Sequence, residues 1–217
     1  MSFFKKIKKS AAEAFYPAVC PYCDKVIAKG SYACKECSAK LPEISYKKFA
    51  IGGYICSAAF PYEGNYARAV KRFKFGNRGD YARPLAFQVV NAVLDIIEDK
   101  SFDLVTCVPM HKVDKRKREY NQAELLAREC AEIMGLPYLD TLEKIKRNNP
   151  QHKTKGKDRG KNVRGVFRVI DKNLVAEKHI LLIDDIITTG HTLGECSAML
   201  SKAGCKKISC AVVCTVV

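Results

Sequence analysis

The sequence predicts an α/β fold built on a parallel sheet, with a small cysteine-bearing segment in front of it. Three observations support this prediction. Apolar runs rich in β-branched residues alternate with helical patterns from residue 102 onward, as in parallel α/β sheets. Two CxxC pairs lie close together near the start of the chain. The 217 residues are enough for one full domain and a small appendage.

The expected strands follow from short apolar runs. Residues 102–110 (FDLVTCVPM) and 179–185 (HILLIDD) read as buried parallel strands. Residues 136–139 offer a further short strand, and KKISCAVVCTVV supplies the last one. Helical patterns cover residues 87–97, 120–134 and 191–203. The last of these is followed by Gly204, a residue typical of the position just past a helix end.

Two segments do not fit the strand and helix rhythm. Residues 1–19 are basic, and Phe3, Ile7 and Phe15 fall near helical spacing. We expect a short amphipathic helix that packs on its own domain, with membrane contact as the alternative. Residues 144–164 are polar and strongly basic, and so long a loop inside a compact domain is usually functional or disordered. We interpret it as a mobile lid.

The charge balance favours anionic partners. There are 38 Lys and Arg residues against 23 Asp and Glu, a formal net charge of +15. Such an excess attracts nucleic acid, an acidic membrane surface or a phosphate-rich small molecule, although it can also serve solubility alone. No apolar run approaches the ~18–20 residues of a membrane span, so we expect no stable membrane insertion.

The first cysteines form a metal-binding pattern. Cys20, Cys23, Cys34 and Cys37 make two CxxC pairs with ten residues between them. Four thiolates at this spacing suit a tetrahedral, structural zinc site. Contact with DNA or protein through Lys25, Lys29 and Lys35 is the alternative role. The other cysteines lie in apolar stretches. Because the sequence shows no secretory signal, we expect them to be buried, reduced thiols in a cytoplasmic protein.

Two acids end the strand at residues 179–185. Asp184 and Asp185 stand at its carboxyl end, where open parallel sheets bind ligands. A turn into a helix N-terminus follows, which favours an anion; its residues are Thr188, Thr189, Gly190, His191 and Thr192. Carboxylates beside a phosphate cradle suit a phosphorylated sugar, because they can accept hydrogen bonds from ribose hydroxyls. The alternative is that both acids only cap the helix.

This motif, HILLIDDIITTGHTL, resembles the signature of type I phosphoribosyltransferases. The resemblance implies a Rossmann-like parallel sheet that binds 5-phosphoribosyl 1-pyrophosphate with magnesium. Asp184 and Asp185 would then stabilise positive charge on the ribose as pyrophosphate leaves. Residues 108–110 and the basic segment after them would bind the pyrophosphate. Lysines and arginines of the lid, such as Lys155 and Arg159, would help to neutralise it.

Further stretches are similar to the ComF family. They are KRKREYNQAELLAR from Lys115, RNNPQHKTKGKDRGKNVRGVF from Arg147 and FPYEGNYARAVKRFKFGNR from Phe60. Together with the cysteine pairs and the acidic motif, the resemblance spans about residues 15–217. It implies a link to competence and DNA uptake. One departure is that the family often has Gly-Phe at Glu119–Tyr120, so the backbone at Glu119 is expected to differ.

The resemblance implies a division of the chain. Residues 1–45 would form the leader helix and zinc finger, and residues 46–217 the phosphoribosyltransferase-like domain. Within that domain, residues 46–100 would be a substrate-selecting hood and residues 101–217 the core. In the hood, aromatic residues from Phe60 to Phe75 interleave with lysines and arginines. This pattern suits single-stranded nucleic acid, or equally an amphipathic helix that buries its aromatic residues.

Two classes of function remain open at this point. The first is an enzyme, a magnesium-dependent phosphoribosyltransferase with an unidentified acceptor, of which nucleobase salvage would be one form. The second is a non-catalytic protein that binds single-stranded DNA and works with other proteins of the DNA-uptake machinery. A fold-level resemblance does not decide between them.

Overall fold

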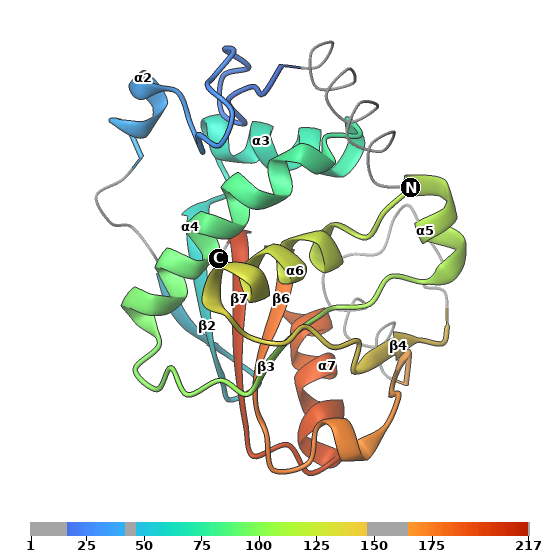
Figure 1. Ribbon diagram of the computed structural model, residues 1–217. Helices are drawn as coiled ribbons and strands as arrows, with labels where there is room; N and C mark the ends of the chain where they lie inside the picture. The colour runs from blue at the N-terminus through green and yellow to red at the C-terminus, as the bar shows by residue number, and fades with distance from the viewer. Residues whose placement is uncertain (1–16, 42–46, 147–164, 217) are drawn as a thin grey trace, which may run out of the picture.

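The structure, a computed structural model, describes residues 17–41, 47–146 and 165–216. Its centre is a five-stranded sheet with the strand order β1-β2-β7-β6-β3 (Figure 1). Neighbouring strands run parallel except for the edge strand β1, which is antiparallel to β2. The strands are β1 Lys47–Ile51, β2 Tyr54–Pro61, β3 Leu104–Cys107, β6 His179–Ile187 and β7 Lys207–Thr215. The predicted parallel α/β sheet is confirmed.

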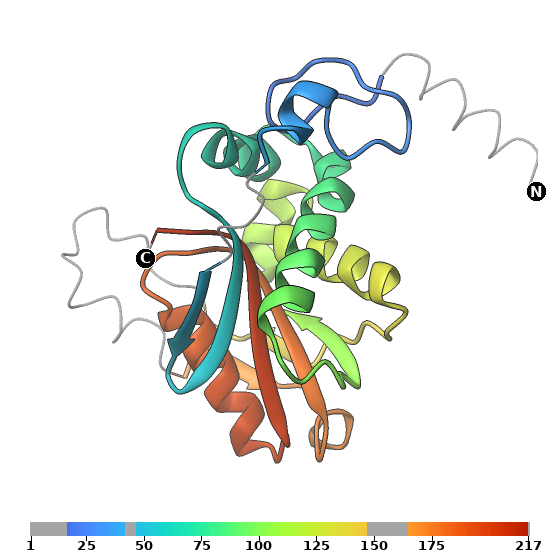
Figure 2. The same ribbon diagram turned by 90° about the vertical axis from the view of Figure 1, so that its left-hand side faces the viewer.

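Helices cover both faces of the sheet. On one face, α4 (Ala82–Ile96) and α6 (Gln122–Met134) pack on the strands, while α7 (His191–Lys202) packs on the other (Figure 2). Because both faces are covered, the central strands are almost continuously apolar and buried. The remaining elements are α2 Lys35–Ser38, α3 Gly64–Phe75, the 3-10 turn Gly79–Tyr81, α5 Lys112–Arg118, the antiparallel pair β4 Leu142–Lys144 and β5 Phe167–Val169, and the 3-10 turn Lys172–Leu174.

The expected strand at residues 136–139 is reduced to a single bridge. Tyr138 pairs with Val105 of β3 in parallel, and the backbone N–H of Val105 donates to the carbonyl of Pro137 at 2.9 Å. Since Pro137 has no N–H of its own, the ladder cannot continue towards Leu136. On the other side, the N–H of Leu139 donates to the carbonyl of Val105 at 3.1 Å. The sequence pattern therefore located an edge contact and overestimated its length.

The expected hood contributes to the main sheet. Residues 46–100 supply β1 and β2, and β2 lies between β1 and β7 as an internal strand. Its Cys56 to Phe60 stretch is buried. Helix α4 packs on this strand, and the run of small residues from Cys56 to Ala59 is the local signal for it. Residues 1–16 of the leader helix expected at 1–19, and residues 147–164 of the expected lid, lie outside the described residues. Residues 17–19 are not helical, and Val19 forms an antiparallel bridge with Val26.

Glu119 ends α5 with a φ of +66°. Glycine adopts positive φ without strain, whereas a residue with a Cβ does not. The glutamate thus adopts a positive φ at the position where the family often has glycine.

Within the described part of the chain, no helix combines the length and apolar character needed to cross a membrane.

Candidate functional site

A cavity of about 460 Å³ opens at the carboxyl ends of β3 and β6. Its wall is formed by the two acids near the carboxyl end of β6, by the loop after β3 and by the last turn of α3. The strand was expected to end at Asp185 and runs two residues further, to Ile187. Of the residues proposed from sequence, Asp184, Asp185, Thr188 and Thr192 line this cavity. The structure therefore brings the two acids of β6 and the loop that follows this strand to one cavity, at the edge where parallel sheets bind ligands.

The two acids are held by backbone amides and by a lysine. Asp184 accepts a hydrogen bond from the N–H of Asp185 at 2.9 Å, and Asp185 accepts one from the N–H of Ile186 at 2.7 Å. Lys74 of α3 places its Nζ 2.9 Å from Oδ1 of Asp185. Burial, and then the charge of Asp185, raise the pKa of Asp184 to about 7. A cation bound beside this carboxyl group would favour its ionised form and lower its pKa.

The raised pKa of Asp184 predicts a pH-dependent stability. A carboxyl group whose folded pKa exceeds its unfolded value stabilises the fold below the unfolded value, near 4, and loses that contribution as the pH rises through about 7. We expect Asp184→Asn to be more stable than the unsubstituted chain at pH 8, by roughly 1–3 kcal/mol. The gain should shrink towards pH 5. Urea unfolding of both proteins across this range checks the trend, and a gain independent of pH would contradict it.

Gly190 shapes the loop between β6 and α7. It has a φ of +73° and precedes the first residue of α7, His191. A Cβ at this position would lie 3.0 Å from Cγ2 of Ile51 in β1. Free N–H groups at a helix start favour an anion, and the threonines of this loop that line the cavity add hydroxyl donors. By contrast, Thr189 and His191 are exposed and lie outside the cavity lining.

A substitution at Gly190 tests this packing. Gly190→Ala should destabilise the fold by about 2 kcal/mol, because alanine strains at positive φ and its methyl group crowds Ile51. Gly194→Ala is the matched control: it lies inside α7, and its Cβ would meet Ile51 at an acceptable 3.4 Å. Alanine there should be neutral or stabilising because it favours the helix. Equal losses in urea unfolding would refute the special role of Gly190.

The loop after β3 is tied to the start of α6. Asn121 donates through Nδ2 to the carbonyl of Val108 at 3.1 Å, and its Oδ1 caps α6 by accepting from the N–H of Ala123. Residues 108–110, the expected pyrophosphate loop, line the cavity together with Arg118. The resemblance had identified the Asn-Gln helix start only as a family pattern. Its structural role is to fix this loop.

Four aromatic residues of β2, of α3 and of the turn between them form two groups. Phe60 and Phe73 are buried in the core, as expected for an amphipathic helix and its strand. Tyr62 and Phe75 instead line the cavity, and Phe75 is 72% exposed with the guanidinium of Arg118 5.3 Å from its ring centre. Lys144, from the start of the expected lid, also reaches the cavity, and burial lowers its pKa.

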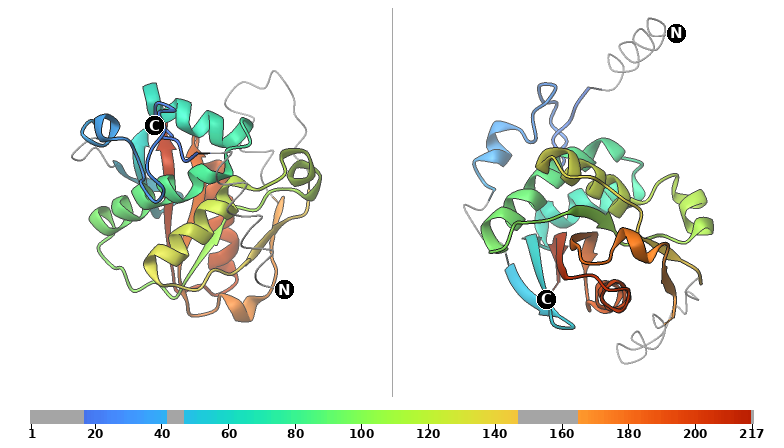
Figure 3. Two further views of the ribbon diagram at one scale, coloured as in Figure 1. Left: turned by 45° about the horizontal axis from the view of Figure 1, so that its top comes forward. Right: turned by 60° about the horizontal axis from the view of Figure 1, so that its bottom comes forward.

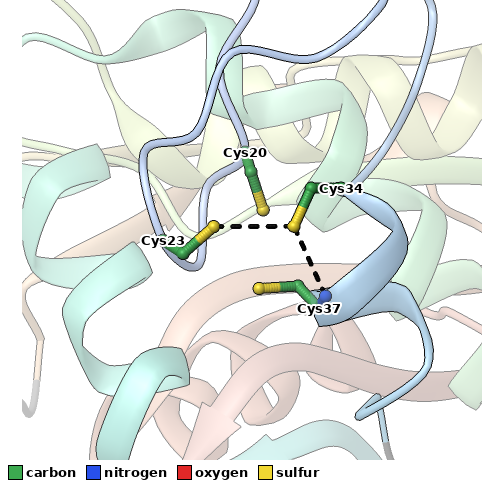
Figure 4. A group of neighbouring side chains, drawn as sticks. All are labelled: Cys20, Cys23, Cys34 and Cys37. Carbon is green, nitrogen blue, oxygen red and sulfur yellow. Dashed lines mark hydrogen bonds between the residues drawn. The ribbon is translucent and has the colours of Figure 1, made fainter.

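The four cysteines converge on one point. Figure 4 shows their side chains directed towards one another from a short loop and from the start of α2. The four sulfur atoms lie within 4.8 Å of each other, and those of Cys23 and Cys34 are 3.6 Å apart. Tetrahedral zinc with sulfur ligands at about 2.3 Å needs sulfur atoms about 3.8 Å apart, so the cluster fits such an ion. The N–H of Cys37, donating to the Cys34 sulfur, leads the effects that lower the pKa of Cys34 to about 7.

The cysteine segment is docked on α3 at one end of the molecule (Figure 3). Tyr22 is buried and packs edge-on against Phe60 and Tyr66. Asp24 accepts from Arg72 at 2.7 Å and from the hydroxyl of Tyr81 at 2.8 Å. Of the lysines considered for macromolecular contact, Lys25 is paired with Glu36. The segment is therefore held by buried contacts as well as by any metal.

Comparisons with known proteins agree with this architecture. A model of the phosphoribosyl transferase domain family matches residues 120–216, from the start of α6 to the end of the sheet. Competence protein F of Haemophilus influenzae is 31% identical over 194 residues, covering 87% of this chain and 82% of that protein. The DNA utilization protein YhgH of Salmonella typhimurium is 25% identical, over 86% of this chain and 79% of that protein. Competence protein ComFC of Streptococcus pneumoniae is 28% identical, over 87% of this chain and 77% of that protein.

Proposed function

Because this chain belongs to the ComF family and contains a phosphoribosyl transferase domain, we propose that it binds 5-phosphoribosyl 1-pyrophosphate with magnesium and acts in DNA uptake. The observation that carries the proposal is the meeting of two adjacent carboxyl groups and a helix N-terminus at one cavity. A helix cap does not account for the two acids, because the N-cap residue of α7 is Gly190 and no side chain caps this helix, while both acids line the cavity.

Each part of the cavity suits one part of the ligand. Asp184 and Asp185 would accept hydrogen bonds from the ribose hydroxyls. The loop with Thr188, Gly190 and Thr192 would hold the 5-phosphate on backbone N–H groups and hydroxyls. The residues after β3, with the basic α5 beside them, would face the pyrophosphate.

The donor set also suits magnesium. This ion prefers oxygen ligands and is usually bound through one or two carboxylates together with substrate phosphates, and Asp184 and Asp185 offer such carboxylates. Bound magnesium would supply positive charge to the leaving pyrophosphate. In a transfer reaction the two carboxylates would stabilise the positive charge that develops on the ribose.

We further propose that Cys20, Cys23, Cys34 and Cys37 hold a structural zinc ion, and that residues 1–45 form a module attached to the domain at 46–217. A cytoplasmic setting would keep these thiols reduced. Single-stranded DNA and proteins of the uptake machinery are the proposed partners. The formal charge of +15 and the exposed Phe75 beside Arg118 favour DNA contact.

Pyrophosphate release separates catalysis from binding. An enzyme should release pyrophosphate from the activated sugar when a suitable base or nucleic-acid acceptor is present. If no pyrophosphate appears with any such acceptor, the transferase part of the proposal is contradicted. DNA binding should fall steeply with salt and survive replacement of both acids by asparagine. Salt-independent affinity would contradict the DNA part.

A further inference from the structure

Lys74 connects α3 to the acid pair. Its ammonium group lies 2.9 Å from Oδ1 of Asp185, with both side chains largely buried at 21% and 9% exposure. The contact joins residues far apart in sequence, and Lys74 lies outside the region that the domain family model matches, residues 120–216. Salt screens a buried ion pair much less than a surface pair, and removal of one partner leaves the other charge buried without compensation.

The backbone around Lys74 is fixed from both sides. The carbonyl of Lys74 accepts a hydrogen bond from Gln122 at 3.3 Å, and that of Phe73 accepts one from the hydroxyl of Tyr120 at 2.7 Å. Two residues earlier, Arg72 is paired with Asp24 of the cysteine segment. The base of the lysine side chain is thus held in place, so its ammonium group is presented to the acid pair by the fold.

The electrostatics of the cavity explain why a fixed ammonium matters there. Two adjacent partly buried carboxylates repel each other and attract any divalent cation. An ammonium group 2.9 Å from one of them offsets part of that repulsion. It also occupies space and hydrogen-bonding capacity that a metal ion at Asp185 would need. The complex of phosphoribosyl pyrophosphate with magnesium differs from the free ion. When its metal ion displaces the ammonium group from Asp185, its phosphate oxygens can accept hydrogen bonds from that group.

We propose that Lys74 is a ligand-binding residue that makes the acid pair selective for magnesium bound to the phosphorylated sugar over the free ion. This inference rests on the proposed function. Free divalent metal must compete with the ammonium at Asp185 and binds weakly. The metal–sugar complex offers phosphate oxygens to the same ammonium and binds well. Metal and sugar therefore enter this site together.

The test uses two ligands whose affinities should change in opposite directions. In Lys74→Met, binding of Mn²⁺ alone, measured by the loss of the free-ion electron paramagnetic resonance signal, should become several-fold tighter. Binding of 5-phosphoribosyl 1-pyrophosphate with Mg²⁺, measured by calorimetry, should weaken about tenfold or more, as for one lost charge-assisted hydrogen bond. Both titrations use the full chain with its zinc.

Two further variants act as controls. Lys74→Arg keeps the positive charge and should restore most of the affinity for the sugar complex. Lys71→Met removes an exposed lysine from the same helix and should change neither constant. Thermal unfolding of each variant shows whether the fold is intact.

Three outcomes would overturn the inference. Parallel weakening of both ligands would mean that Lys74 acts only on folding, and unchanged constants would mean that it has no role in the site. In either case binding of the sugar complex by the unsubstituted chain would leave the proposed function standing. If the unsubstituted chain does not bind the sugar complex, the proposed function fails, and the inference fails with it.

Discussion

Replacing Asp184 and Asp185 together by asparagine is expected to abolish binding of 5-phosphoribosyl 1-pyrophosphate with magnesium. Asparagine keeps the size of each side chain but removes the negative charge that a magnesium ion and the ribose hydroxyls require. Loss of two carboxylates at a partly buried site should weaken binding by at least about a hundredfold. Calorimetric titration of the folded double variant measures this loss.

A matched control is available on the surface. Asp95 lies on the last turn of α4 and is exposed, so Asp95→Asn removes the same charge away from the cavity. It should leave the affinity unchanged. If the double variant bound the sugar as tightly as this control does, the acids would have no part in the site and would serve only the local backbone.

Removal of zinc is expected to unfold residues 17–41 and loosen α3. Within the segment only Cys20, Pro21 and Tyr22 are buried, and its one short helix, α2, buries no residue, so we expect these contacts to be too few to hold it without the ion. Structural zinc sites in small modules contribute folding free energy on the order of 10 kcal/mol. Without the ion, the ring contact between Tyr22 and Phe60 and the hydrogen bond from Arg72 to Asp24 should both break. Hydrogen exchange measured by mass spectrometry should then rise in residues 17–41 and in α3.

Substitution of single cysteines gives the control for this experiment. Cys37→Ser should lose zinc and reproduce the exchange pattern of the chelated protein. Cys205→Ser changes a partly buried thiol after α7 that does not belong to the cluster, and it should retain one zinc ion per chain. Unchanged exchange after complete removal of the metal would show that the segment folds on its contacts with α3 alone.

Features that depend on neighbouring residues could be predicted from the sequence. The strand β6, the two acids near its carboxyl end and the turn into α7 are encoded in one continuous stretch, so the sequence places the carboxyl groups near a strand end without reference to any other segment. The cysteine spacing likewise depends on local turns. The structure confirms the parallel sheet and brings the four sulfur atoms together.

Features that depend on distant segments could not be predicted in this way. The pairing of Lys74 with Asp185 arises only when α3 is laid over the carboxyl edge of the sheet. No local pattern distinguishes Lys74 from the other lysines of its helix. The strand β2 was missed for a related reason: its small buried residues match no alternating pattern, and its place is set by pairing with β7 near the end of the chain.

The central claim is that this cavity holds a phosphorylated ribose together with magnesium. A calorimetric titration of the zinc-loaded chain with 5-phosphoribosyl 1-pyrophosphate, run with Mg²⁺ and again with the metal chelator EDTA in place of Mg²⁺, tests it most directly. Because EDTA also withdraws zinc, a third run adds Zn²⁺ in slight excess over the chelator. The account predicts one saturable site per chain with Mg²⁺ and much weaker binding in both other runs. No saturable binding with Mg²⁺, or equal binding in all three, would contradict it.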